Sequence, residues 1–505
     1  MTRVSLLLIA SVGCFGACGS DEAYVLVTVE ARPSVHDVTK LRVTLDNGGT
    51  SRTDDLLLDG NTLPSTFTVT APGRSGELGI SVDAIDATDT VVGVGTTLGA
   101  LDQDAAKVLL ESTDFVVNTE VAMTQELSNY TRANGFQLGA NDNEWMSTFT
   151  ISPCSPACNM FGRRFDATGL PVMTQVAASK NQFALNTRPS NLLSTPAVAA
   201  NKTVMLAVWN QYDPAPATTR SIACRTFDAT GGANPAQVEV ATDENPDVVS
   251  IAPLANGNFA VVWDGTVTTQ MIRSAVIKPD CTMLNVSQVQ TAAGVPRGSH
   301  LAASTDRVMY AWTVDGAAHV RLATNGNVFL TGDLALVPKT ATESVEHVRV
   351  AALPGGNFAV IVRWALDAGT GAGRIEMFRT NMLGAIQGTP TLVTDKSGSE
   401  FTQSEGFGVA VRGDGALLVV WHACDELGDG VGCGVWGRVM RSNGSAVAPE
   451  FGLATTTLGD QRGPSAAALA DSFVVAWTDS SKTAPDTSDN AVRARVIYPA
   501  FDDAQ

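Results

Sequence analysis

Short runs of alternating apolar and polar residues follow the first two dozen residues of the chain. Such runs occupy 24–29, 41–45, 66–70 and 78–82. An alternation of period two over five or six residues predicts a strand with one buried face. Turn signals such as Asp46-Asn47-Gly48-Gly49 separate the runs. Roughly seven short strands in this stretch predict an immunoglobulin-like β-sandwich over residues 24–120.

From about residue 131 the pattern becomes a repeat with a period of about fifty residues. Its marker is an apolar strand that ends in tryptophan, at Trp209, Trp263, Trp312, Trp364, Trp421 and Trp477. The intervals between these tryptophans are 54, 49, 52, 57 and 56 residues. Trp364 comes two residues late in its unit, and a degenerate seventh unit, 148–151, ends 58 residues before Trp209 without the aromatic residue.

Each unit continues with a variable loop, a second strand and a turn, and then a third and a fourth strand. The second strand and its turn have the form Arg-x-Phe-Asp-x-x-Gly, as in Arg225 to Gly231. Four strands in about fifty residues predict a propeller blade. The last unit stops after its second strand, near Ile497, and a candidate for the missing third strand, 135–139, precedes the first unit. We therefore predict a closed seven-bladed β-propeller over residues 131–505, after a linker at 121–130.

These repeats resemble those of bacterial cell-surface lipoproteins and large secreted adhesin-like proteins, in which the strand ending in tryptophan and the Arg-x-Phe-Asp-x-x-Gly motif recur. The resemblance covers about residues 131–505. It implies a propeller-type fold and little about activity, because many such proteins have no defined function. The calcium loops of integrin-type repeats and the Asp box of sialidase-type propellers are absent from the sequence.

The N-terminus has the pattern of an export signal, with Arg3 followed by the apolar run 4–10. This run is too short to span a bilayer as a helix. Cys14 and Cys18 each follow a small residue, which is similar to the lipobox of bacterial lipoproteins. The position three residues before each cysteine is Ser or Phe, however, where the lipobox usually has Leu. An ordinary secretory signal therefore stays open as the alternative.

The number of cysteines favours Cys18 as the lipidated residue, with Cys14 as the alternative. Cleavage before Cys18 leaves six other cysteines, whereas cleavage before Cys14 leaves seven and so an unpaired thiol. We expect a signal peptide over 1–17 and an anchor and linker over 18–23. The expected location is the cell envelope, on the outer membrane of a Gram-negative bacterium, either periplasmic or at the surface.

The six remaining cysteines are expected to form disulfides: Cys154, Cys158, Cys224, Cys281, Cys424 and Cys433. Cys154 with Cys158 and Cys424 with Cys433 each bracket a variable loop, and Cys224 with Cys281 pair by elimination. Zinc is the competing interpretation of the Cys154-x-x-x-Cys158 spacing. Export favours disulfides, although a bridge across three residues is geometrically tight.

The charge balance narrows the range of partners. The chain has 33 Lys and Arg against 51 Asp and Glu, a formal net charge of −18. Its basic residues are dispersed, which excludes nucleic acid as the main partner, because phosphate binding needs clustered cations. We expect a monomer that contacts the membrane through its lipid and binds a glycan or a protein.

The variable loops are the expected binding surface, because binding residues are commonly carried on loops of a rigid scaffold. The candidate residues on or near these loops are Tyr212, Asp213, His422, Asp425, Glu426, Asp429, Trp436, Asp486 and Asp489. Asp425, Glu426 and Asp429 could together hold a divalent cation, but no ligand spacing is recognisable and a solvated acidic loop is favoured. The repeated tryptophans are expected to pack between blades, which leaves Trp436, off register, as the better surface candidate.

No catalytic motif stands out. The five histidines lie in no nucleophile-elbow or metalloprotease pattern. The sequence therefore predicts no cofactor and no metal, and a membrane-tethered, non-enzymatic binding or adhesion protein that uses the loop face of the propeller. The alternative hypothesis is an exported polysaccharide hydrolase or lyase with acids at the propeller mouth, because propellers often host such sites.

Overall fold

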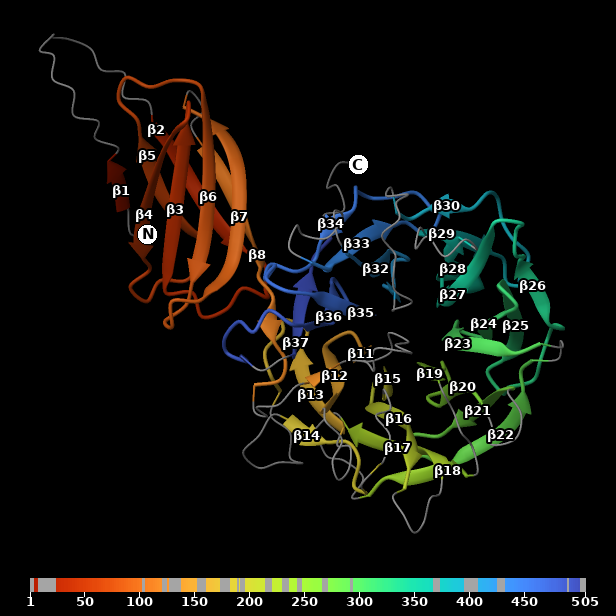
Figure 1. The fold of residues 1–505 in the computed structure, drawn as a ribbon. Helices are drawn as coiled ribbons and strands as arrows, with labels where there is room; N and C mark the ends of the chain where they lie inside the picture. The colour runs from red at the N-terminus through yellow and green to blue at the C-terminus, as the bar shows by residue number, and fades with distance from the viewer. Residues whose placement is uncertain are drawn as a thin grey trace, which may run out of the picture. The chain divides into compact units, whose positions relative to one another are not determined.

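The computed structural model divides the chain into two compact units, residues 1–114 with Val496–Tyr498 and residues 115–495 with 499–505 (Figure 1). The residues that the structure describes are 4–7, 24–101, 105–119, 125–126, 138–151, 160–172, 182–188, 190, 196–213, 220–228, 236–242, 248–265, 271–290, 294–366, 373–394, 407–424, 432–487 and 490–499. Among these residues the fold is all-β, as predicted, with one short 3-10 turn, η1 (Pro354–Gly356). Within the described part of the chain, no helix has the length and apolar character needed to cross a membrane.

The first unit is a sheet of eight strands in the order β1-β5-β2-β8-β7-β6-β3-β4. The strands are β1 (Val4–Leu7), β2 (Tyr24–Ala31), β3 (Lys40–Asn47), β4 (Thr50–Leu57), β5 (Ser65–Thr70), β6 (Glu77–Ile85), β7 (Val91–Ala100) and β8 (Ala105–Ser112). The alternation predicted from the sequence is present: along β2, Val25, Val27 and Val29 are buried and their neighbours are more exposed. The turn predicted at 46–49 joins β3 to β4.

One hydrophobic core lies within this unit and takes side chains from β2, β3, β5, β6 and β8. Strand β8 pairs with β2 along most of its length and with β7 at its end, so the pairing is continuous around the core and the sheet forms a half-barrel. The predicted immunoglobulin-like sandwich is not confirmed, because β7 and β8 join what would be two separate sheets.

The second unit contains seven sheets arranged as the blades of a propeller (Figure 1), as the repeats predicted. Blade 1 has β10 (Gln125–Glu126), β11 (Leu138–Ala140), β12 (Glu144–Ile151), β13 (Met160–Asp166) and β14 (Gln182–Ala184); blade 2 has β15 (Ala197–Ala200), β16 (Val204–Tyr212), β17 (Arg220–Asp228) and β18 (Val238–Thr242); blade 3 has β19 (Val248–Pro253), β20 (Phe259–Asp264), β21 (Ile272–Ile277) and β22 (Met283–Gln288). Blade 4 has β23 (Pro296–Ala303), β24 (Arg307–Val314), β25 (Ala317–Thr324) and β26 (Leu334–Val337); blade 5 has β27 (Glu343–Ala352), β28 (Phe358–Leu366), β29 (Gly373–Thr380) and β30 (Thr391–Leu392); blade 6 has β31 (Gly408–Val411), β32 (Leu417–Ala423), β33 (Gly434–Met440) and β34 (Phe451–Gly452). Blade 7 has β35 (Gln461–Ala468), β36 (Phe473–Asp479), β37 (Ala491–Ile497) and, as its outermost strand, β9 (Phe115–Val116).

The ring of blades is closed. The innermost strands β11, β15, β19, β23, β27, β31 and β35 contact one another in this order, and β35 contacts β11. The predicted closing strand was wrong: residues 138 and 139 belong to β11, the innermost strand of blade 1, and 135–137 lie outside the described residues. Blade 7 is completed instead by β9, which pairs with β37 in the same register that β34 takes on β33 in blade 6.

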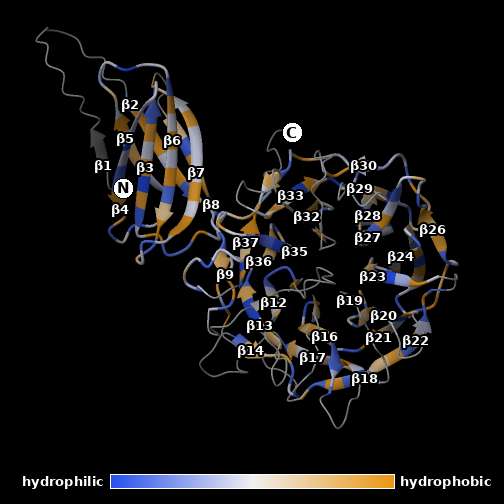
Figure 2. Ribbon diagram, viewed as in Figure 1, coloured by the Kyte–Doolittle hydropathy of each residue, from blue (hydrophilic) through white to orange (hydrophobic). Residues whose placement is uncertain are grey.

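The repeated tryptophans are buried between blades, as predicted, and Figure 2 shows the propeller strands to be largely hydrophobic. Trp209 packs with residues of blades 1 and 2, and Trp263 with residues of blades 2 and 3. Strand register also corrects the degenerate first unit. Phe149 pairs with Phe161 just as Trp209 pairs with Ala223, so an aromatic residue does occupy this position in blade 1.

The arginine of the repeated motif connects neighbouring blades. In blade 2, Arg225 Nη1 donates to the carbonyl oxygens of Ala184 and Leu185 at the outer strand of blade 1, at 2.7 and 3.2 Å. Within the described residues, arginines at the same register in four other blades make the corresponding bond, Arg163 to Val117, Arg321 to Val289, Arg438 to Val393 and Arg495 to Leu453. Because Val117 directly follows β9, the Arg163 bond belongs to the ring closure.

Two of the expected disulfides are confirmed. Cys224 and Cys281 join blade 2 to blade 3, with their Cα atoms 5.9 Å apart. Cys424 and Cys433 close the loop between β32 and β33. Cys154 and Cys158 lie outside the described residues, as do Cys14 and Cys18.

Candidate functional site

The loop end of the propeller is defined here as the end where the second strand of each blade passes into the third. Of the candidate residues there, Asp425, Glu426, Asp429 and Asp489 lie outside the described residues. The other five are described, and none of them is exposed.

In blade 2, Asp213 and Tyr212 follow the core tryptophan and serve local contacts. Asp213 is buried; its Oδ1 accepts a hydrogen bond from Gln211 Nε2 at 2.9 Å, and its Oδ2 lies 3.6 Å from Arg188 Nη1. Tyr212 is half-buried under the guanidinium of Arg220, which lies 4.7 Å from the ring centroid. These contacts hold the entrance of the loop at 214–219 rather than presenting free side chains.

The candidates in blades 6 and 7 are also built into the fold. His422 is buried, and Trp436 is half-buried against the core shared by blades 5 and 6. Asp486 is buried and its Oδ2 accepts a hydrogen bond from Asn118 Nδ2 at 2.5 Å. Since Asn118 also accepts the N–H of Val492 through its Oδ1, Asp486 helps to anchor the segment that closes the ring.

Blade 5 departs from the repeat, and a charged cluster lies at its loop end. The pairing of the second and third strands places Val362 of blade 5 at the position that Trp312 occupies in blade 4. Trp364 therefore lies two residues nearer the loop end than the tryptophan of blade 4 does. The cluster consists of Glu343, Trp364, Arg374 and Glu376, and we call it the blade 5 cluster. It combines the first, second and third strands of one blade.

Arg374 is at the centre of the blade 5 cluster. Its Nη1 pairs with Glu343 Oε1, its Nε with Glu376 Oε1 at 3.0 Å, and its guanidinium lies 5.0 Å from the Trp364 ring centroid. The Trp364 indole N–H donates to Glu376 Oε2 at 2.8 Å. Although burial alone would lower it, the two carboxylates raise the pKa of Arg374 above its ordinary value. The side chains of Arg374, Glu343 and Glu376 keep 28%, 19% and 17% of their exposure, so solvent reaches all three.

A second ion pair lies on the inner strand of the same blade. Strand β27 has a bulge between Val345 and His347, and the extra residue is Glu346. Glu346 Oε2 lies 3.2 Å from Nη1 of the buried Arg363. Burial lowers the pKa of Arg363, and the charge of Glu346 opposes that shift. Strands β23 and β35 have bulges near the same place, so the bulge itself is a feature of several blades.

Blades 4 and 5 also share a buried basic pair on their innermost strands. Burial, aided by the charge of Arg349, lowers the pKa of His300 well below its usual value, and burial lowers the pKa of Arg349 to about 9. His300 Nδ1 accepts a hydrogen bond from the N–H of Val350 at 3.2 Å. This bond requires the unprotonated nitrogen, so His300 is a neutral structural residue that joins the two strands.

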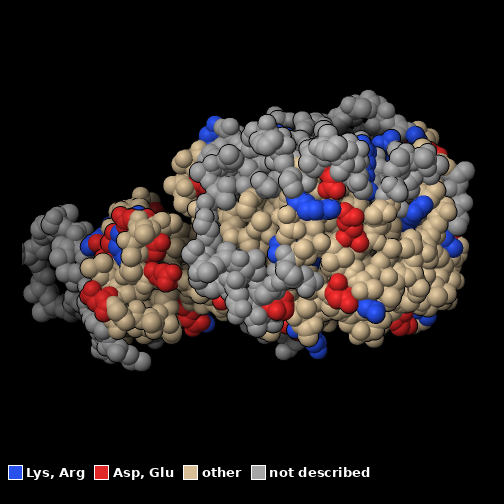
Figure 3. Space-filling model, turned by 90° about the horizontal axis from the view of Figure 1, so that it is seen from below, with Lys and Arg blue, Asp and Glu red and all other residues tan. Residues whose placement is uncertain are grey.

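The described residues contain no group of three or more His, Cys, Asp and Glu that could hold a metal ion. On the face shown in Figure 3, acidic and basic side chains are scattered among uncharged ones and form no large field of one sign. The blade 5 cluster is one of several local groups of opposite charges, and it differs from the Arg188 group of blade 2 in having an indole, that of Trp364, bonded to one of its carboxylates.

The sequence analysis did not find this cluster, although one signal pointed to it. In the repeat, Trp364 comes two residues later than the other tryptophans do. This shift marks blade 5 as the blade whose tryptophan lies at the loop end and not at the usual core position. Glu343, Arg374 and Glu376 carried no such mark, because they come together only through the pairing of β27, β28 and β29.

No family model and no curated protein sequence matches the chain. Solved structures similar in fold include a polysaccharide lyase, with 6% identity, a TM-score of 0.49 and coverage of 77% of this chain and 99% of the other. An α-L-arabinofuranosidase from Fusarium graminearum has 11% identity, a TM-score of 0.38 and coverage of 58% and 89%. A protein of unknown function from Dyadobacter fermentans has 11% identity, a TM-score of 0.41 and coverage of 76% and 99%. Likenesses this weak assign no function to the chain.

Proposed function

We propose that this protein cleaves a polysaccharide, as a hydrolase or a lyase, at the loop end of propeller blade 5. The observation that carries the proposal is the blade 5 cluster, in which one guanidinium holds two partly exposed carboxylates in fixed positions. This choice replaces the adhesion hypothesis favoured by the sequence, whose described candidate residues are engaged in structural contacts.

The groups present match what glycosidic bond cleavage requires. Hydrolysis uses one carboxyl group to protonate the leaving oxygen and a second to activate water or attack the sugar. Glu343, Glu376 and nearby Glu346 are the carboxylates available for these roles. Elimination instead needs a base and a cation that stabilises negative charge developing on the substrate, and Arg374 is the cation. A rigid Trp364 contact and two ion pairs keep Arg374 oriented.

A panel of acidic and neutral polysaccharides incubated with the purified protein tests this proposal. New reducing ends without a double bond identify a hydrolase, and products carrying a conjugated double bond identify a lyase. Glu376→Gln is expected to lower the rate at least about 100-fold, because a positioned acid or base commonly contributes that much. Glu239→Gln, on β18 of blade 2, removes a carboxylate that also pairs with an arginine; it is the matched control and should leave the rate unchanged.

One observation favours a second candidate, which is binding without cleavage. Glu343, Glu376 and Arg374 bond to one another beside the Trp364 ring, and a few fixed polar groups next to an aromatic side chain can hold a sugar without cleaving it. If the panel finds a polysaccharide that binds saturably but yields no product, and Trp364→Ala abolishes that binding, the protein is a tethered binding module.

We further propose that the protein is exported and held at the cell envelope by a lipid on Cys18, which lies outside the described residues. Cleavage before Cys18 would remove the edge strand β1, so the other seven strands of the first unit would remain in the mature protein. The support is the charged and apolar pattern of residues 3–10 and the even number of cysteines left after cleavage before Cys18. Metabolic labelling with a radioactive fatty acid should mark the wild-type chain and not Cys18→Ser. A labelled Cys18→Ser chain and an unlabelled Cys14→Ser chain would place the lipid on Cys14 instead.

A further inference from the structure

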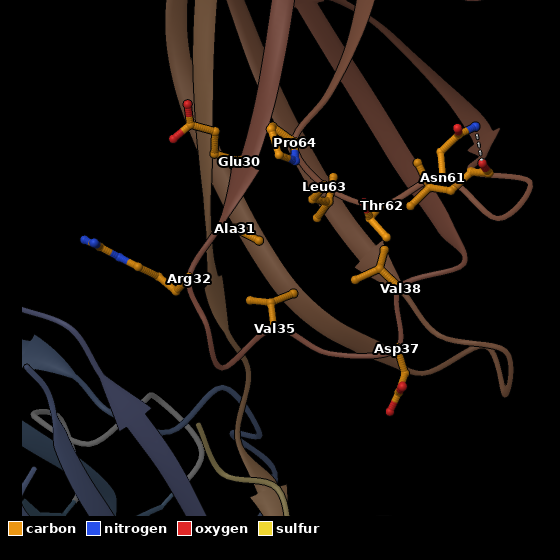
Figure 4. Close-up of a pocket in the computed structure, with 11 residues that line it drawn as sticks. Glu30, Ala31, Arg32, Val35, Asp37, Val38, Asn61, Thr62, Leu63 and Pro64 are labelled. Atoms are coloured by element: carbon orange, nitrogen blue, oxygen red, sulfur yellow. Dashed lines mark hydrogen bonds between the residues drawn. The ribbon is translucent and has the colours of Figure 1, made fainter. Parts of the chain in front are cut away.

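A cavity of about 570 Å³ lies at one end of the first unit (Figure 4). Its walls are the end of β2 with the loop after it, residues 30–38, and the loop from β4 to β5, residues 58–64. Sites for small molecules commonly have volumes of about 300–1,000 Å³ and often occupy the mouths of barrels. The size and place of this cavity are therefore those of a ligand site.

Apolar side chains form the inside of the cavity. Ala31, Val35, Val38 and Leu63 all pack against the core of the unit, and Leu58 beside them is buried. In Figure 4 the side chains of Val35, Val38 and Leu63 point into the space between the two loops. An apolar ligand there would extend the hydrophobic core, at a gain of about 25 cal/mol for each Å² removed from water.

The charged residues of the cavity are at its rim and are directed away from it. Figure 4 shows Glu30, Arg32 and Asp37 pointing outward. Glu30 pairs with Lys107 at 2.8 Å, and Arg32 pairs with Glu111 at 2.9 Å. A charged ligand inside the cavity would lose water without gaining a counter-ion, which is costly. The cavity chemistry therefore selects uncharged ligands.

The remaining lining groups limit the ligand further. Of the residues that line the cavity, none is aromatic, so no stacking surface for a sugar is present. Thr62 and Asn61 are the polar residues without charge, and Asn61 Nδ2 already donates to the Leu58 carbonyl at 2.7 Å. Backbone hydrogen bonds hold the two wall loops in place. The N–H of Leu58 donates to the carbonyl oxygen of Thr39, and the N–H of Val35 donates to that of Arg32, each at 3.0 Å.

We propose that this cavity is a preformed binding site for an uncharged, mainly apolar small molecule with at most one hydroxyl-like polar group. The ligand class follows from the apolar interior, the outward charges and the missing aromatic surface. The site is independent of polysaccharide cleavage by the propeller, and either proposal can fail without the other.

The uncharged dye Nile red, titrated into the full chain, tests the site by fluorescence. Saturable binding is expected, with an affinity at least about ten times lower in Val38→Phe and Ala31→Phe, whose rings fill the cavity. Leu98→Ala is the matched control, since Leu98 is 71% exposed on β7 of the same unit. Equal affinity in the filling variants, or loss of binding in Leu98→Ala, would overturn the proposal.

Competition on the wild-type protein keeps the test decisive if the filling variants do not fold. Octanol, octanoate and octylammonium share one chain and differ in charge, and octanol should displace the dye at a concentration at least about ten times lower than either ion. Equal displacement by octanoate would mean that charge is not excluded, and the proposal would be wrong.

Discussion

The arginine of the repeated motif shows how one residue type stabilises the whole ring. The sequence marks Arg225 only as the start of a strand and turn. In the structure its guanidinium crosses to the neighbouring blade and donates to two carbonyl groups at the end of that blade's outer strand. A planar group with several N–H donors and a permanent charge suits this task better than lysine does.

Arg225→Ala is expected to lower the free energy of unfolding of the propeller by about 2–3 kcal/mol, because hydrogen bonds to charged groups contribute about 1.5–3 kcal/mol. Chemical denaturation followed by tryptophan fluorescence measures this, since all eight tryptophans lie between residues 145 and 477. Arg297→Ala is the control: Arg297 is exposed and forms no ion pair within the described residues, so its loss should change stability by less than about 0.5 kcal/mol. Equal losses in the two variants would contradict the role given to Arg225.

His300 makes the stability of the propeller depend on pH. Its pKa is lowered in the folded state, so the unfolded chain binds the proton more readily and stability falls as the pH drops below about 6.5. The loss approaches about 1.4 kcal/mol per pH unit until the folded pKa is reached. Urea unfolding between pH 7 and pH 5 should show this slope in the wild type and a weaker one in His300→Gln. An unchanged slope in His300→Gln would show that other groups cause it.

For single loop residues, the sequence did not predict which side chains are buried or which distant residues they bond. Asp486 was predicted to belong to the binding surface because it lies in a variable loop of a rigid scaffold. Its partner Asn118 is 368 residues away in the chain, and no local pattern announces the pair. The burial of the repeated tryptophans was predicted correctly, because an apolar strand that recurs in the same register in every unit indicates a core position.

The closing strand β9 is the element that decides whether the ring is complete. Two residues form it, and the same pattern of hydrogen bonds recurs in blade 6, where Leu453 N–H bonds to Val435 as Val117 N–H bonds to Val492. The sequence-based choice of 135–139 failed because a strand this short carries almost no composition signal. The number of blades and the order of their strands were predictable, because the same succession of strands and turns recurs in each unit of the repeat.

Asn118→Ala should weaken the ring closure. The substitution removes the bonds of Asn118 to Asp486 and to Val492 N–H, a loss of about 2–4 kcal/mol in the free energy of unfolding. Protease cleavage near β9 should become faster before the rest of the propeller unfolds. Asn143→Ala, in the exposed turn between β11 and β12 of blade 1, is the control and should behave like the wild type. A variant as stable and as protease-resistant as the wild type would mean that β9 contributes little to closure.

In the whole molecule, the contacts that stabilise the propeller lie between neighbouring blades all around the ring. The residues at the loop end can therefore differ between blades without loss of the fold. A closed ring of blades leaves only short, protected strand edges, and each blade is joined to the next by buried side chains and, in most blades, by arginine. The Cys224–Cys281 bridge adds a covalent link between two blades. Such a scaffold tolerates a departure from the repeat, and blade 5 carries one.

Replacing both Cys224 and Cys281 with alanine should lower the free energy of unfolding by about 2–5 kcal/mol, as expected for the loss of a native disulfide. Reductant should lower the stability of the wild type by more than that of the double variant, which retains only the Cys424–Cys433 bridge among the disulfides of the described residues. A double variant that remains as sensitive to reductant as the wild type would show that another cysteine pair is responsible.

The measurement that tests the central claim most directly is the initial rate of product release from one cleaved polysaccharide by the wild-type protein, by Glu376→Gln and by the control Glu239→Gln. We predict a rate at least about 100-fold lower for Glu376→Gln and an unchanged rate for Glu239→Gln. Full activity of a correctly folded Glu376→Gln would contradict a catalytic site at the blade 5 cluster.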